Sequence, residues 1–145
     1  MTNFGVVALA IAFVGGLALT ESALSRPSYG PQESNRQQAE SPIACVRSAL
    51  SPEQRKRHFD ELGPQLRARK KSVRELPDGF EFEFSSDAAT FQLAAEWAAG
   101  EHVCCPFFDI DLRMVREHGP LLLRLSGRDG VKQFIEAEGS AWLKQ

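Results

Sequence analysis

Cysteine is scarce in this sequence of 145 residues, which has only Cys45, Cys104 and Cys105. Three cysteines are too few, and odd in number, for a disulfide framework. The formal net charge of −2 gives no general attraction to nucleic acid or to a membrane surface. The sequence also lacks a phosphate-binding loop, a G-x-S-x-G elbow, an H-E-x-x-H helix and a C-x-x-C pair, so no nucleotide or organic cofactor is indicated.

Lys and Arg are absent from residues 1–20, and residues 4–19 form an uninterrupted run of apolar and small side chains. As a helix this run would be about 24 Å long, which is short for a hydrocarbon core of about 30 Å. It is similar to the apolar part of a signal peptide, without the usual basic segment before it. We therefore predict that residues 1–24 are a hydrophobic leader. The chain is then membrane-associated through one N-terminal segment, or exported if the leader is cleaved.

Residues 25–41 are polar and rich in Pro, Ser and Gln, which is typical of a flexible linker. The linker contains the first basic residues, Arg26 and Arg36. If the leader is a retained anchor, these charges favour the cytoplasmic side for the C-terminal domain. The globular domain is predicted to span residues 42–145, with residues 43–46 as a short strand or an extended arm.

The first part of this domain is predicted to be helical. Residues 51–54 (Ser-Pro-Glu-Gln) match a helix start with a capping box, and an apolar stripe continues from there at helical spacing. The Gly63-Pro64 pair is expected to break or kink this helix. The eight basic side chains of residues 55–74 are interpreted as a solvated face, because no aromatic residues interleave for base stacking. No nucleic-acid partner is expected.

Two hairpins with apolar and polar residues in alternation come after this helix, over residues 72–84 and 107–125. Between them, Asp87 is predicted to cap a helix that runs to about Cys104, and a last helix begins after Gly130. The order is helix, hairpin, helix, hairpin, helix. It predicts an α+β fold, in which two ββα-like units form a four-stranded antiparallel sheet with helices packed on it.

The residues that suggest chemistry lie where the middle helix gives way to a strand. On a helix, Glu101 shares a face with Cys104 and Cys105, and His102 shares a face with Cys105. Pro106 should end the helix, and the negative end of the helix dipole opposes thiolate formation. A soft cation would instead deprotonate the thiols by coordinating them. The pattern favours binding of an ion over nucleophilic attack by a thiol. An alternative interpretation is that the cysteines only fill space in the core.

Several short motifs lie in the domain: Ile43-Ala44-Cys45, Ala49–Glu53, Arg74–Gly79, Glu101 followed by Cys104–Phe108, and Leu123-Arg124-Leu125 with Gly127 and Gly130. Through them the chain from Ser41 onward resembles a family of small, largely uncharacterised bacterial proteins that have a Cys near the domain start and a Glu-x-x-Cys-Cys-Pro-Phe motif. The resemblance covers about 105 residues and leaves out residues 1–40. It implies no established activity, but it implies that Cys45, Glu101, Cys104 and Cys105 belong together.

Three functions fit these residues. The first is binding of a soft metal or metalloid: Cys45, Cys104 and Cys105 suit Hg(II), As(III) or Cu(I), and Glu101 or His102 would complete a four-coordinate Zn(II) site. The second is a thiol-dependent enzyme. It would either cleave an organometal with two thiols and the Glu101 acid, the set used by organomercurial lyases, or do redox chemistry with His102 as a base. The third is an interaction module with structural cysteines.

The expected partners are a metal ion or small thiophilic ligand, and a membrane through residues 4–19 if the leader is retained. The two other histidines, His58 and His118, lie on a charged helix and in a turn. Both are expected to be solvent-exposed and not to act as ligands.

Overall fold

The computed structural model describes residues 40–144. The predicted leader and nearly all of the predicted linker lie outside the described residues. The described part of the chain belongs to one compact unit. Among residues 40–144, no helix is both long enough and apolar enough to cross a membrane.

The sheet has four antiparallel strands: β1 (Ser72–Leu76), β2 (Gly79–Phe84), β3 (Asp109–Met114) and β4 (Leu121–Ser126). Their order is β1-β2-β4-β3, so the second strand of each hairpin lies in the centre. The register pairs Phe82 with Leu123, which brings the alternating apolar residues of β2 and β4 to one face. The predicted α+β fold with its four-stranded antiparallel sheet is confirmed.

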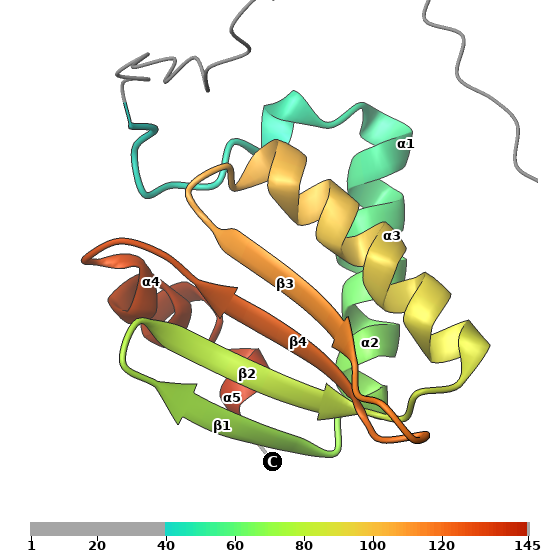
Figure 1. The fold of residues 1–145 in the computed structure, drawn as a ribbon. Helices are drawn as coiled ribbons and strands as arrows, with labels where there is room; N and C mark the ends of the chain where they lie inside the picture. Colours follow the sequence, from blue (N-terminus) through green and yellow to red (C-terminus); the bar gives the residue numbers. More distant parts are fainter. Residues whose placement is uncertain (1–39, 145) are drawn as a thin grey trace, which may run out of the picture. The chain divides into compact units, whose positions relative to one another are not determined.

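Helices cover one face of this sheet (Figure 1). Ser51 and Gln54 form the predicted capping box at the start of the first helix. Asp87 caps α3 by accepting a hydrogen bond from the backbone N–H of Thr90. The helical segments are η1 (Arg47–Ala49), α1 (Pro52–Arg55), η2 (Lys56–Leu62), α2 (Gly63–Arg69), α3 (Ala88–Cys104), α4 (Val131–Glu138) and α5 (Ser140–Leu143).

Of the break or kink expected at the Gly63-Pro64 pair, the break is wrong, because the first helix continues through it. The chain stays helical from Pro52 to Arg69, because η2 is a π-helix in which the Gly63 N–H donates to the His58 carbonyl, five residues back. Pro64 then lies in the first turn of α2, where a missing N–H is tolerated. Such wide turns often occur at functional sites, and this one carries the buried His58.

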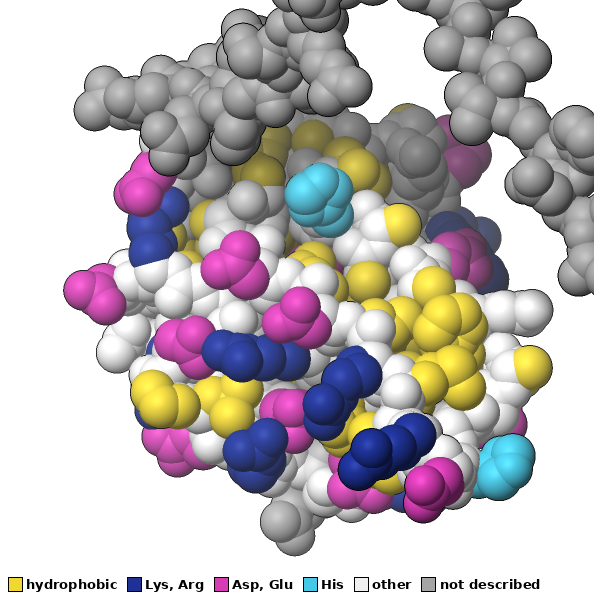
Figure 2. All heavy atoms as spheres, in the orientation of Figure 1, with side chains coloured by type: hydrophobic (Ala, Val, Ile, Leu, Met, Phe, Trp, Pro, Cys, Tyr) yellow, Lys and Arg dark blue, Asp and Glu magenta, His cyan; other side chains and the backbone are white. Residues whose placement is uncertain are grey.

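The core lies between the helices and the apolar face of the sheet. Its fully buried side chains include Phe82 and Phe84 of β2, Leu121 and Leu123 of β4, and Leu66. On the opposite face of the sheet, acidic and basic side chains are interspersed (Figure 2). The buried cysteines, in contrast, lie at the C-terminal end of α3, on the helical side of the sheet.

Candidate functional site

An N-terminal arm, residues 40–46, places Cys45 at the end of α3. The arm contains no strand, so the strand predicted as one of two forms is wrong, and the chain bends at Ile43 and Ala44. The Val46 N–H donates to the Cys104 carbonyl at 2.6 Å, which satisfies one of the backbone oxygens left free at a helix C-terminus. Arg128 holds the other end of the arm, through the Ser41 carbonyl and the Glu40 carboxylate.

The structure brings together the three cysteines that were grouped from the sequence. Cys45 and Cys105 form a disulfide across a sequence separation of 60 residues. Cys104 is a free, fully buried thiol, and its Sγ lies 3.6 Å from the Sγ of Cys105. The sequence did not predict this disulfide, because the pairing depends on how the arm docks against α3.

Glu101 links this sulfur cluster to the first helix. Its Oε2 lies 4.0 Å from the Cys104 Sγ, and its Oε1 lies 3.1 Å from Nε2 of His58. The Glu101 carboxylate belongs to two groups of side chains of metal-binding types. One group is Cys45, Glu101 and Cys105, and the other is His58, Glu101 and Cys104. Within each group the ligand atoms all lie within 4.8 Å of one another.

His58 is a residue of this cluster that the sequence did not reveal. The expectation that it is solvent-exposed is wrong, because only 3 % of its surface is accessible. Its ring stacks on Trp97, at 5.8 Å between centroids and an interplanar angle of 13°, and Phe59 packs edge-on against it. Its Nδ1 has no hydrogen-bond partner among the described residues.

Gly100 makes room for this ring. A Cβ added to Gly100 would lie 2.3 Å from Nδ1 of His58. A glycine inside a helix has a cost of about 1 kcal/mol relative to alanine, so its presence near the end of α3 is the sign in the sequence that another group packs closely there.

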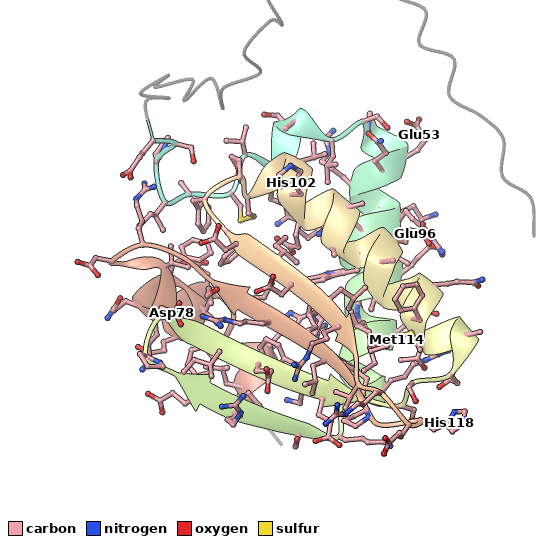
Figure 3. All side chains as sticks on the ribbon, viewed as in Figure 1. Glu53, Asp78, Glu96, His102, Met114 and His118 are labelled. Carbon is pink, nitrogen blue, oxygen red and sulfur yellow. A yellow bond between two sulfur atoms is a disulfide. The ribbon has the colours of Figure 1, made fainter. Side chains whose placement is uncertain are left out.

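The remaining histidines lie outside this cluster. His102, a predicted ligand, is exposed on α3 and belongs to neither group of metal-binding residue types (Figure 3). His118 is exposed in the β3–β4 turn, as expected.

Cys104 is not an activated nucleophile. Burial raises the pKa of its thiol to about 11, the Glu101 carboxylate acts in the same direction, and the Arg47 guanidinium opposes them weakly. The raised pKa agrees with the sequence-based expectation that the thiol is a weak nucleophile. The largest cause of the raised pKa is burial, however, and not the helix dipole.

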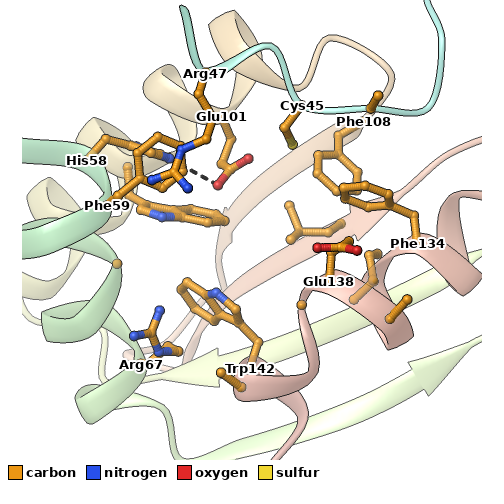
Figure 4. A pocket seen from close by; sticks show the side chains of 18 of the residues that line it. Cys45, Arg47, His58, Phe59, Arg67, Glu101, Phe108, Phe134, Glu138 and Trp142 are labelled. Atoms are coloured by element: carbon orange, nitrogen blue, oxygen red, sulfur yellow. Dashed lines mark hydrogen bonds and ion pairs between the residues drawn. The ribbon is translucent and has the colours of Figure 1, made fainter. Parts of the chain in front are cut away.

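A cavity of about 720 Å³ lies beside Cys45 (Figure 4). Cys45 and Glu101 form part of its wall, and β2, β4 and the helices form the rest. Most of its lining is apolar, with aromatic rings from Phe59, Trp97, Phe108, Phe134 and Trp142.

Comparisons with protein-family models, with curated proteins and with solved structures find no match to this chain. The family resemblance of the domain therefore stays a prediction, and the function is inferred from the geometry of the site.

Proposed function

We propose that the reduced protein binds a soft metal or metalloid ion through Cys45, Cys104 and Cys105, with Glu101 beside them. The observation that carries this proposal is the convergence of three sulfur atoms from two segments that are 60 residues apart. The buried Cys104 and Cys105 and the half-buried Cys45 together are a donor set for thiophilic ions of low coordination number, such as Hg(II), As(III) or Cu(I).

The spacing of the sulfur atoms supports a shared ion. Metal–sulfur bonds of about 2.3 Å would place three sulfurs around a trigonal ion about 4 Å apart. The Cys104 and Cys105 sulfurs, at 3.6 Å, are already close to that spacing. The Cys45 and Cys105 sulfurs have to separate, and they do so when an external dithiol supplies two electrons and two protons to open their disulfide.

A four-coordinate Zn(II) site is the less favoured form of this proposal. Glu101 could supply an oxygen ligand, because its carboxylate lies with Cys45 and Cys105 in one group within 4.8 Å. However, two adjacent cysteines lack the two-to-four-residue gap of ordinary zinc sites. A softer ion with fewer ligands fits the pair better.

A second candidate function is thiol–disulfide exchange, which the contact of 3.6 Å between Cys104 and Cys105 also suggests. Attack of Cys104 on the Cys105 sulfur would form a Cys104–Cys105 bond and break the Cys45–Cys105 bond, and the proton of Cys104 would pass to Cys45. The raised pKa of Cys104 slows this attack, because the thiolate is the nucleophile. Ion binding is therefore the preferred function.

Native mass spectrometry on the full reduced chain in detergent tests the proposal. Hg(II), As(III), Cu(I) and Zn(II) are offered in turn, with glutathione as a competitor. We expect one soft ion to be retained, and to be lost in Cys45→Ser, Cys104→Ser and Cys105→Ser. His102→Ala is the matched control, since this side chain lies outside the cluster, and it should keep the ion. Failure of the reduced chain to retain any ion would overturn the proposal.

A further inference from the structure

The cavity beside Cys45 is much larger than a bare ion requires. Its volume of about 720 Å³ lies within the range of about 300–1,000 Å³ that is usual for small organic ligands. Cys45 and Glu101 lie on one side of it, and Arg67 and Trp142 lie on the other side (Figure 4). A ligand held by the sulfurs would therefore have an organic part extending towards Trp142.

The aromatic part of the cavity wall suits a flat apolar group. Trp97 and Trp142 lie 4.7 Å apart between ring centroids and are tilted by 47°, and Phe108 and Phe134 form the wall near Cys45. Aromatic pairs favour such offset or tilted contacts and gain energy beyond the area they bury. An inorganic ion, or an ion that carries only a methyl group, would leave the cavity side of most of these rings without a contact to the ligand.

We propose that this cavity holds the organic group of an aryl-substituted soft cation, such as an arylmercury(II) or arylarsenic(III) species, while the cysteines bind its metal atom. The inference rests on the proposed function and names its ligand class. As each sulfur–metal bond forms, the thiol proton leaves with a labile hydroxide or halide of the ion. The carbon–metal bond stays intact, and no electrons are transferred.

Two alanine positions provide a matched pair of variants for testing this. Ala137 on α4 lines the cavity and is exposed, so Ala137→Leu should fill part of the space without disturbing the core. Ala99 on α3 is also exposed but does not line the cavity, so Ala99→Leu is the control. Phe134→Leu is a second variant, which removes one ring from the wall.

The experiment measures binding of phenylmercury, methylmercury and Hg(II) to the full reduced chain, with free cysteine as the competitor. After normalisation to free cysteine, we expect phenylmercury to bind at least tenfold more tightly than methylmercury. Ala137→Leu and Phe134→Leu should each remove most of this preference and leave Hg(II) binding unchanged, and Ala99→Leu should change neither.

Two failures can be told apart. If Hg(II) is retained but phenylmercury shows no preference over methylmercury, the aryl site is wrong and the thiol site stands. If neither inorganic nor organic ions are retained, the proposed function fails and the aryl site fails with it. Equal losses in Ala137→Leu and Ala99→Leu would also overturn the aryl site.

Discussion

The imidazole of His58 and the carboxylate of Glu101 form a buried pair, with Nε2 and Oε1 3.1 Å apart. The two side chains are 3 % and 12 % exposed, and they come from helices far apart in the sequence. An ionised carboxylate only accepts hydrogen bonds, so Nε2 is then the donor. The contact fixes the direction of Glu101, whose other oxygen faces Cys104.

Gly100→Ala is expected to destabilise the protein. In an ordinary helix this substitution would stabilise by about 1 kcal/mol. Here the new Cβ would lie 2.3 Å from Nδ1 of His58, and overpacking of this kind costs about 1–3 kcal/mol. The measurement is the free energy of unfolding from denaturant titration. In a His58→Ala background the space is empty, so Gly100→Ala should be neutral or stabilising there. An equal loss of unfolding free energy in both backgrounds would contradict the close packing of Gly100 against His58.

Glu101→Gln is expected to lower the pKa of the buried Cys104 thiol, which is measured from the ultraviolet absorbance of the thiolate as a function of pH. In the oxidised protein Cys104 is the free thiol, and removing the neighbouring negative charge lowers its pKa from about 11. The midpoint of the profile of thiolate absorbance against pH should therefore move to lower pH. It should stay above the value for free cysteine, because burial is the larger cause and remains in the variant.

Glu96→Gln is the control for that experiment, since Glu96 is also on α3 but pairs with Arg57. It should leave the profile of Cys104 unchanged. A profile that is the same in Glu101→Gln and in the wild type would show that Glu101 does not act on the thiol.

The stability of the oxidised protein should fall between pH 9 and pH 11. The pKa of Cys104 is raised from 9.0 to about 11 by folding, so the unfolded chain releases this proton first as the pH rises. The stability that the protonated Cys104 thiol contributes is fully present below pH 9. It is lost as the pH rises through the pKa of about 11 that this thiol has in the folded protein. The disulfide keeps Cys45 and Cys105 from titrating.

The measurement is the free energy of unfolding against pH for the wild type and for Cys104→Ala. Other groups titrate in the same range, and they contribute equally to both proteins. We therefore expect the wild-type curve to fall more steeply above pH 9. Parallel curves would contradict a raised pKa at Cys104.

Much of the fold could be predicted, because its determinants are local. Local signals correctly predicted the start of two helices, through the capping residues Ser51 and Asp87. The alternation of residues 80–84 likewise predicted a strand that is present. The Gly63-Pro64 pair was misleading because the π-helix before it keeps the chain helical, with Pro64 in the first turn of α2.

The site was less predictable, because it is assembled from distant segments. Spacing on one helix indicated the group of Glu101, Cys104 and Cys105. The burial of His58 could not be inferred from its basic neighbours, since it depends on a gap left by Gly100. His102 has the right spacing, but its side chain is exposed. The leader remains a prediction, because residues 1–24 lie outside the described residues.

The most direct test of the three-thiol site is X-ray absorption spectroscopy at the mercury edge, on the full reduced chain loaded with one equivalent of Hg(II). The spectrum counts the sulfur neighbours of the ion. We predict three sulfur ligands in the wild type and two in Cys104→Ser, with His102→Ala unchanged. Two sulfur ligands in the wild type, with no change in Cys104→Ser, would contradict the account, because Cys104 would then be only a buried core residue.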